Sequence, residues 1–119
     1  MQPPSAARID ATFAALADGA RREMLRVLLH KPRRAGELAS LVSMSPQALS
    51  RHLRLLRESG LVMEEGIAGD ARVRLYSVHP DAFLPLRDWL ADVEDAWRRQ
   101  LQSFKSYAEG AHRARRSKS

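Results

Sequence analysis

Polar side chains that could bind DNA bases recur on one side of a single predicted helix, residues 45–59. Ser45 and Pro46 are typical of the first positions of a helix, and Gly60 is typical of the position after its end. Three leucines, at positions 49, 53 and 56, have helical spacing and predict one buried stripe. The other side of the helix carries Gln47, Ser50, Arg51 and Arg54.

These residue types match the hydrogen-bonding groups in the major groove of double-stranded DNA. Arginine pairs bidentately with guanine and glutamine with adenine, and a helix fits the groove. The amides at the start of the helix and the hydroxyl of Ser45 could meet a phosphate. We include Ala48 among the predicted DNA contacts because it lies in the same first turns. A merely solvated face is the alternative interpretation of Arg51 and Arg54.

The segments before this helix predict three further helices. Residues 9–17 have the helical period, and Asp18 is a predicted N-cap for a second helix that ends at His30 before Pro32. Its expected inner side carries Met24, Leu25, Leu28 and Leu29. A short helix at about 36–41 is expected to bury Leu38 and Leu41. The turn Val42-Ser43-Met44 then joins it to the helix at 45–59, which is the pattern of a helix-turn-helix.

The segment 61–78 predicts a two-stranded hairpin. Apolar residues begin a strand at Leu61, Gly69-Asp70 suits a turn, and residues 72–78 alternate in the manner of a half-buried strand. Arg72 and Arg74 fall on one side of the second strand, where they could contact a phosphate or a minor groove. Ion pairs with Glu64 or Glu65 across the hairpin are the alternative. Such a hairpin is marginal alone and must pack on the helices.

A long final helix at about 86–109 carries an apolar stripe. The stripe consists of Leu86, Leu90, Val93, Trp97 and Phe104, with Trp89, Leu101 and Tyr107 beside it. A domain of this size does not need so much apolar surface on one helix. We divide the chain into a flexible N-terminus at 1–8, one domain at 9–109 and a basic, disordered tail at 110–119.

The 119 residues include no cysteine, 20 Lys and Arg and 14 Asp and Glu, which gives a net charge of +6. The absence of cysteine excludes disulfides, thiolate metal sites and cysteine nucleophiles. The net charges of residues 31–57, 81–95 and 110–119 are +5, −4 and +4, so the charge is strongly segregated. The acidic segment is expected to be a solvated helix face rather than an acid–base pair. No Ser-His-Asp, nucleotide-loop or zinc-hydrolase motif occurs, and we expect the chain not to be an enzyme.

The chain resembles the arsenic-repressor (ArsR/SmtB-type) winged helix-turn-helix regulators. The resemblance rests on the segments FAALADGARREMLRVLL, GELASLVSMSPQALSRHLRLLRESGLV and RVRLYSV and covers about residues 9–108. It implies a mainly helical fold, with four helices, a hairpin and a last helix, and a homodimer formed by the first and last helices. The implied function is repression from an inverted-repeat operator, with helix 45–59 in the major groove and hairpin 61–78 as the wing. The implied dimer residues are Ile9, Phe13, Leu86, Trp89, Leu90, Val93, Trp97, Leu101 and Phe104.

The metal-sensing members of that family differ from this chain at their metal ligands. Their cysteine pair in the third helix is replaced here by Glu37, Leu38 and Ala39, and the final helix lacks the Asp-x-His pattern because Leu90 follows Asp88. The chain resembles the metal-independent branch, so we expect no metal and no cofactor, and the inducing ligand stays unknown. The alternatives are a metal or small-molecule sensor with an unrecognised site and an interaction module that has lost DNA binding.

Several other charged and titratable residues have structural interpretations. Arg21 and Arg22 are expected to form pairs with Asp18 or Glu23, whereas Arg33 and Arg34 could meet a phosphate. His52 is expected to pack or to accept a local hydrogen bond, and the other histidines are expected to be caps or spectators. The N-terminal residues MQPPSAARID contain no signal-peptide stretch, and no segment is apolar enough to span a bilayer. We therefore expect a cytoplasmic protein.

Overall fold

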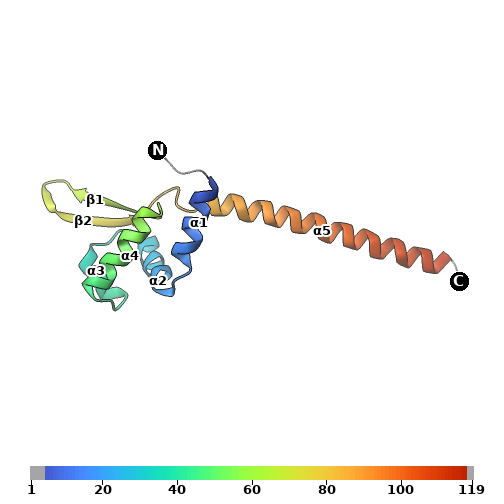
Figure 1. The fold of residues 1–119 in the computed structure, drawn as a ribbon, viewed down its shortest axis with the longest axis horizontal. Coiled ribbons are helices and arrows are strands. Elements are labelled where there is room, and N and C mark those ends of the chain that lie inside the picture. The colour runs from blue at the N-terminus through green and yellow to red at the C-terminus, as the bar shows by residue number, and fades with distance from the viewer. Residues whose placement is uncertain (1–4, 118–119) are drawn as a thin grey trace. The chain divides into compact units, whose positions relative to one another are not determined.

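The fold is known from a computed structural model, which describes residues 5–117 of the chain (Figure 1). The elements in order are α1 (Ser5–Leu16), α2 (Gly19–His30), α3 (Ala35–Leu41), α4 (Pro46–Glu58), β1 (Val62–Ile67), β2 (Asp70–Val78) and α5 (Leu84–Ser117). This order confirms the predicted winged helix-turn-helix with a long last helix. The chain forms two compact units, one up to Leu86 and one from Arg87 onward. We describe each unit by itself.

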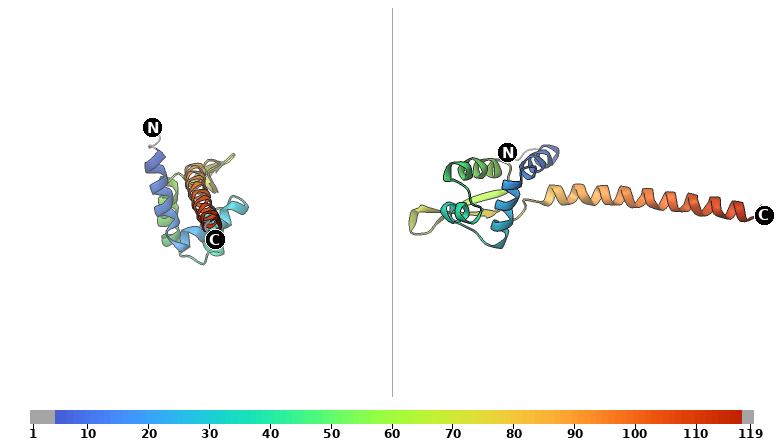
Figure 2. Two further views of the ribbon diagram at one scale, coloured as in Figure 1. Left: turned by 90° about the vertical axis from the view of Figure 1, so that its right-hand side faces the viewer. Right: turned by 90° about the horizontal axis from the view of Figure 1, so that it is seen from below.

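The first unit contains α1–α4 and the hairpin (Figure 2). Its hydrophobic core is formed by buried side chains of the four helices together with Leu61, Val62 and Ala82. α2 and α4 contribute stripes of apolar side chains at helical spacing, as expected of amphipathic helices, whereas α1 and α3 contribute one and two buried apolar residues. The largest fully buried side chains of the core are Met24, Leu38, Leu49, Leu56 and Leu61. The three leucines predicted to be buried on α4 are all in this core, which fixes the opposite side of α4 toward solvent.

Local hydrogen bonds define both ends of α4. Ser45 is the N-cap, and its Oγ accepts a hydrogen bond of 3.2 Å from the backbone N–H of Ala48. At the other end Gly60 has a φ of 78°, a left-handed conformation in which a side chain would be strained. The tight turn before α4 contains Ser43 at a φ of 53°, and the N–H of Met44 donates to the carbonyl of Ala39. These contacts fix α3 and α4 as a helix-turn-helix.

β1 and β2 form the antiparallel hairpin that the alternation predicted. Glu64 lies opposite Tyr76 in the register, and the pairing is irregular between Gly66 and Ile67. The base of the hairpin is attached to the loop between α2 and α3. The backbone N–H of Arg33 donates to the carbonyl of Tyr76 at 3.0 Å, and the N–H of Tyr76 donates to the carbonyl of Arg33 at 2.8 Å. The loop therefore anchors the strand that carries Arg72 and Arg74.

Some predicted details are wrong. Leu29 and Leu41 are 62% and 49% exposed, because only part of each helix's apolar surface meets the core. α1 begins at Ser5 rather than Ile9, and α5 continues past Glu109 to Ser117. Gly110 follows Glu109 and is typical of a helix end, but the alanines and arginines after it are strong helix formers and no proline stops the helix. The disorder and flexibility expected at the two ends stay predictions, and residues 1–4 and 118–119 lie outside the described range.

Candidate nucleic-acid interface

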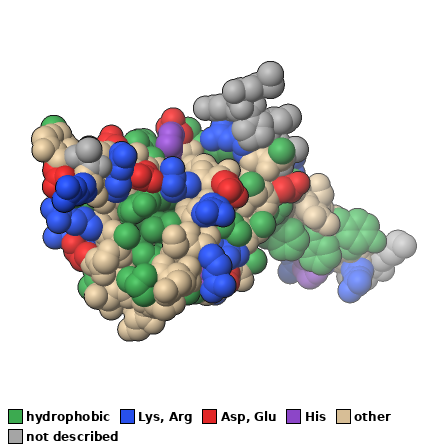
Figure 3. All heavy atoms as spheres, turned by 60° about the vertical axis from the view of Figure 1, so that its left-hand side comes forward, with side chains coloured by type: hydrophobic (Ala, Val, Ile, Leu, Met, Phe, Trp, Pro, Cys, Tyr) green, Lys and Arg blue, Asp and Glu red, His purple; other side chains and the backbone are tan. Residues whose placement is uncertain are grey.

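The outer side of α4 carries the four predicted base-reading side chains. Gln47, Ser50, Arg51 and Arg54 are all exposed, whereas the leucines on the opposite side are buried. The helix thus has one apolar and one polar stripe, and the polar stripe holds two guanidinium groups one turn apart. Figure 3, turned toward the side of the first unit that carries the hairpin, shows basic side chains at the surface among apolar and acidic ones.

The start of α4 provides polar groups for a phosphate. Ser45 is exposed, and its Oγ already accepts the hydrogen bond from Ala48. A serine hydroxyl that accepts one bond can still donate its own proton. The amide of Ala48 is used in this cap and its methyl group is half-buried, so Ala48 offers less to a ligand than its position in the sequence indicates.

The two arginines of the hairpin differ in their surroundings. The side chain of Arg72 is exposed near the tip of the hairpin. Arg74 is 53% exposed, and its Nε lies 3.3 Å from Oε1 of Glu64 on the paired strand. The other carboxylate oxygen of Glu64 lies 2.8 Å from Nη1 of Arg57, in the last turn of α4. The alternative ion pair across the hairpin is therefore present for Arg74.

Tyr76 faces this ion-pair cluster from the opposite strand. Burial raises the pKa of its phenol, and the negative charge of Glu64 raises it further. The phenol therefore stays protonated at neutral pH. The participation of Arg57 was not anticipated, because residues 57 and 64 lie on different elements and no sequence spacing pairs them.

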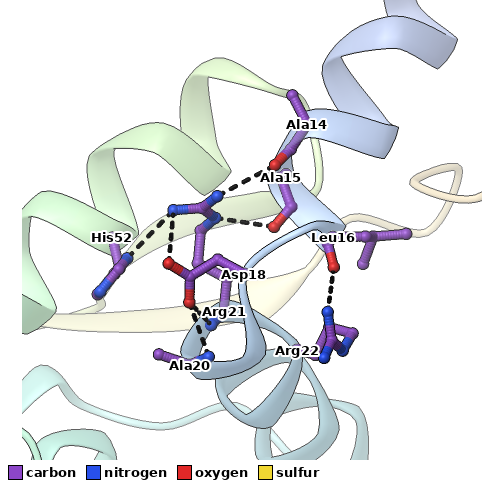
Figure 4. Close-up of polar contacts among 8 residues, drawn as sticks. All are labelled: Ala14, Ala15, Leu16, Asp18, Ala20, Arg21, Arg22 and His52. Carbon is purple, nitrogen blue, oxygen red and sulfur yellow. Dashed lines mark hydrogen bonds and ion pairs between the residues drawn. The ribbon is translucent and has the colours of Figure 1, made fainter.

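Arg21 of α2 connects α1, α2 and α4 (Figure 4). Its Nε donates to the carbonyl of Ala15 at 2.8 Å, and its Nη2 donates to the carbonyl of Ala14 at 3.0 Å. These carbonyls belong to the last turn of α1, where backbone acceptors have no partner within the helix. Nη1 lies 3.5 Å from Asp18 and 3.4 Å from Nδ1 of His52 on α4. Because a guanidinium only donates, Nδ1 can only be the acceptor in this contact.

Three further arginines, on α2 and in the loop after it, have structural partners. Nη1 of Arg22 donates to the carbonyl of Leu16 at 2.7 Å, which gives α1 a second arginine cap. Arg33 is ion-paired with Glu37 and only 16% exposed, so its guanidinium is less open to a phosphate than that of the exposed Arg34, and a phosphate contact by either residue stays a prediction. Arg26 pairs with Glu23 on the surface of α2.

Asp18 is both an N-cap and a partner of Arg21. Its Oδ1 accepts from the backbone N–H groups of Ala20 and Arg21, at 2.7 and 3.4 Å. The hydrogen bond from Ala20 is the main reason why the pKa of Asp18 lies below its usual value of 3.8. The predicted cap and the predicted pair between Arg21 and Asp18 are both confirmed.

The histidine side chains do not lie together in a cluster. His52 contacts Arg21, and Nδ1 of His79 accepts a hydrogen bond of 3.1 Å from the N–H of Asp81. Within residues 5–117, no group of three or more His, Cys, Asp or Glu side chains could hold a metal ion. No helix in the described part of the chain is long and apolar enough to cross a membrane.

The second unit contains the greater part of α5 and most of the residues expected at a dimer interface. Trp97 is 58% exposed and Phe104 is 70% exposed. The other exposed apolar side chains of this unit are Trp89, Leu90, Val93, Leu101 and Tyr107. In the first unit, Ile9 and Leu86 are half-buried and Phe13 is exposed.

A capped helix with an exposed arginine-bearing side, preceded by a tight turn and followed by a hairpin wing, defines the winged helix-turn-helix class of DNA-binding proteins. Residues 18–64 match the model of the bacterial regulatory protein arsR family. The chain is also 37% identical over 95 residues to the HTH-type transcriptional regulator Rv2034 of Mycobacterium tuberculosis, covering 80% of this chain and 83% of that protein. The chain therefore belongs to the ArsR family of DNA-binding transcriptional regulators.

Solved structures of similar proteins have the same fold. An ArsR-like transcriptional regulator from Rhodococcus sp. RHA1 is 28% identical, with a TM-score of 0.75 over 92% of this chain and 98% of that one. A domain from Mycobacterium bovis, described as a homodimeric winged helix-turn-helix DNA-binding domain, is 22% identical. Its TM-score is 0.60 over 79% of this chain and 88% of that one, and it shows the fold alone. Membership of a family of regulators agrees with the expectation that the chain is not an enzyme.

Proposed function

We propose that the chain is a repressor that binds an inverted-repeat operator through α4. The observation that carries the proposal is the exposure of Gln47, Ser50, Arg51 and Arg54 on one side of a helix whose other side is buried. α4 would lie in the major groove, with Ser45 and the first turn, including Ala48, near a phosphate. Arg72 and Arg74 of the hairpin would lie over the adjacent backbone or minor groove.

The operator symmetry follows from a homodimer, which we also propose. α5 has 34 residues and is about 50 Å long at 1.5 Å per residue. Leu90, Val93, Trp97, Leu101 and Phe104 present a long apolar stripe that solvent reaches. Contiguous apolar surface of this kind usually marks an interface, and a second copy of the same helix would cover it. The residues of the first unit that would join it are Ile9, Phe13 and Leu86.

The regulator would belong to the metal-independent branch of the family. This proposal is supported by the residues present at the family's usual ligand positions, Glu37 to Ala39 in α3 and Asp88 and Leu90 in α5. Acidic residues alone at such spacing do not make the nitrogen and sulfur ligand set that these transition-metal sites use. The protein would act in the cytoplasm, where its DNA lies.

Selection of fragments bound from genomic DNA tests the proposal directly. We expect enriched fragments to share an inverted repeat whose half-sites lie about one helical turn apart. Arg54→Ala is expected to weaken operator binding by about 5- to 150-fold, which corresponds to about 1–3 kcal/mol. Arg26→Ala, which removes an exposed arginine of α2, is the control. Equal affinities of wild type and Arg54→Ala would contradict the assignment of the outer side of α4, and bound sites without symmetry would contradict the dimer.

A further inference from the structure

Glu64 lies between the two DNA-binding elements of the first unit. Its carboxylate is 19% exposed and contacts an arginine with each oxygen. Oε2 is 2.8 Å from Nη1 of Arg57 on α4, and Oε1 is 3.3 Å from Nε of Arg74 on β2. Because different oxygens are used, both ion pairs exist at once. One carboxylate therefore joins the reading helix to the wing.

The cluster borders the side of the molecule proposed to meet DNA. Arg54, Arg57 and Glu64 line one surface hollow of about 430 Å³, together with Glu58, Val62 and Met63. Arg57 follows Arg54 by three residues, so the two side chains are neighbours on the helix surface. Both Arg57 and Arg74 are about half exposed, at 50% and 53%, and a DNA phosphate could approach either of them.

An arginine that is already paired with a carboxylate contributes less to DNA binding than a free one. Binding to DNA of any sequence depends on cations that replace the counterions of the phosphates. A phosphate that approaches Arg57 or Arg74 must compete with Glu64, and it also meets the negative charge of that carboxylate. The pairs are partly shielded from water, so they are screened less by salt than fully exposed pairs.

We propose that Glu64 limits sequence-independent binding to DNA by withholding Arg57 and Arg74 from phosphates. This inference rests on the proposed DNA binding by α4 and the wing. Glu64 acts as an internal competitor of the phosphate backbone. It also holds the wing against α4, so the geometry of the two reading elements is set before DNA arrives.

The chain offers a matched control for removal of the charge. Glu65 is the next residue of β1, and its side chain is exposed on the opposite face of the hairpin. No ion pair involving Glu65 is found among the described residues. Glu64→Gln and Glu65→Gln change the net charge equally, but only Glu64→Gln releases two arginines. Any difference between them therefore reports the ion pairs rather than the overall charge.

The experiment measures binding of the full chain to a random-sequence DNA duplex by fluorescence anisotropy over a range of KCl concentrations. Each phosphate contact contributes about 0.9 to the slope of log affinity against log salt. For Glu64→Gln we expect a slope steeper than that of Glu65→Gln by about 1 to 2, and an affinity increased roughly three- to tenfold at 0.1 M salt. Equal slopes and affinities for the two variants would overturn the proposal.

A second comparison does not depend on how well Glu64→Gln folds. Arg72 and Arg74 lie on the same side of β2, and only Arg74 is paired with Glu64. Arg72→Gln is expected to lower the salt slope by about 0.9, whereas Arg74→Gln should lower it by less than half as much. If Arg74→Gln lowers the slope as strongly as Arg72→Gln, Glu64 does not withhold Arg74. Absence of salt-sensitive binding by the wild type would instead refute the proposed DNA binding, and this inference with it.

Discussion

Replacement of Arg21 by methionine should destabilise the first unit much more than replacement of its neighbour Arg22. Methionine keeps an unbranched apolar stem and removes the guanidinium. The side chain of Arg21 is 14% exposed and donates hydrogen bonds of 2.8 and 3.0 Å to the carbonyls of Ala15 and Ala14. Its contact with His52 also ties α2 to α4.

The expected magnitude follows from these contacts. A hydrogen bond from a charged donor contributes about 1.5–3 kcal/mol when it is shielded from water. Only the bond to Ala15 is partly buried, and the bond to Ala14 is exposed, so the second bond counts for less. We therefore expect Arg21→Met to lower the free energy of unfolding by about 2–4 kcal/mol. That is a large share of the roughly 5–15 kcal/mol that stabilises a typical domain.

Urea unfolding followed by circular dichroism at 222 nm measures this difference. All variants must be compared at one protein concentration, because a dimer's stability depends on it. Arg22→Met is the matched control, since it makes the same charge change in the same helix turn but removes one exposed hydrogen bond to Leu16. We expect it to cost about 1 kcal/mol or less. A loss for Arg21→Met no larger than that for Arg22→Met would refute the role of Arg21 as the link between α1, α2 and α4.

Two other predictions concern α5 and the N-cap of α2. Trp97→Glu places a charge in the exposed apolar stripe of α5 and should convert the proposed dimer into monomers with weaker operator binding. Sedimentation equilibrium measures the mass, and an unchanged mass would contradict the proposed interface. The folded-state pKa of Asp18 lies below its usual value of 3.8. The ionised carboxylate therefore stabilises the fold fully above pH 3.8, and this stabilisation is lost as the pH falls through the lower folded-state pKa. The difference in unfolding free energy between wild type and Asp18→Asn should therefore be constant near neutral pH and shrink below pH 3.8. Urea unfolding at several pH values checks this, and a difference independent of pH would contradict it.

The ends of α4 and of α2 were predictable because their signals are local. Ser45, Pro46 and Gly60 fix the limits of α4 through a cap hydrogen bond, a preset backbone angle and a left-handed residue. A side-chain cap at Asp18 likewise fixes the start of α2. The periodicity of the leucines between these caps then determines which side of α4 faces the core. The predicted reading side chains followed directly, since they occupy the remaining side.

Exposure was harder to predict where a helix has more apolar residues than one core can cover. Leu29 and Leu41 are as apolar as Leu28 and Leu38, yet they are exposed while the others are buried. The period of a helix gives the direction of each side chain, but it does not give the distance to the nearest neighbouring element. The end of α5 was missed for another reason, because Gly110 is a typical stop signal that the helix passes through, and helix-forming alanines and arginines follow it.

The sequence by itself determined the class of fold, the segregation of charge and the polar side of α4 that we propose reads DNA. These properties depend on residue types and on spacings within one element. Tertiary structure alone decided which charged side chains are paired with each other. Arg21 meets His52 across 31 positions, and Glu64 collects one arginine from α4 and one from β2. Ion pairs between elements depend on distances set by packing of the core, and no spacing along the chain encodes those distances.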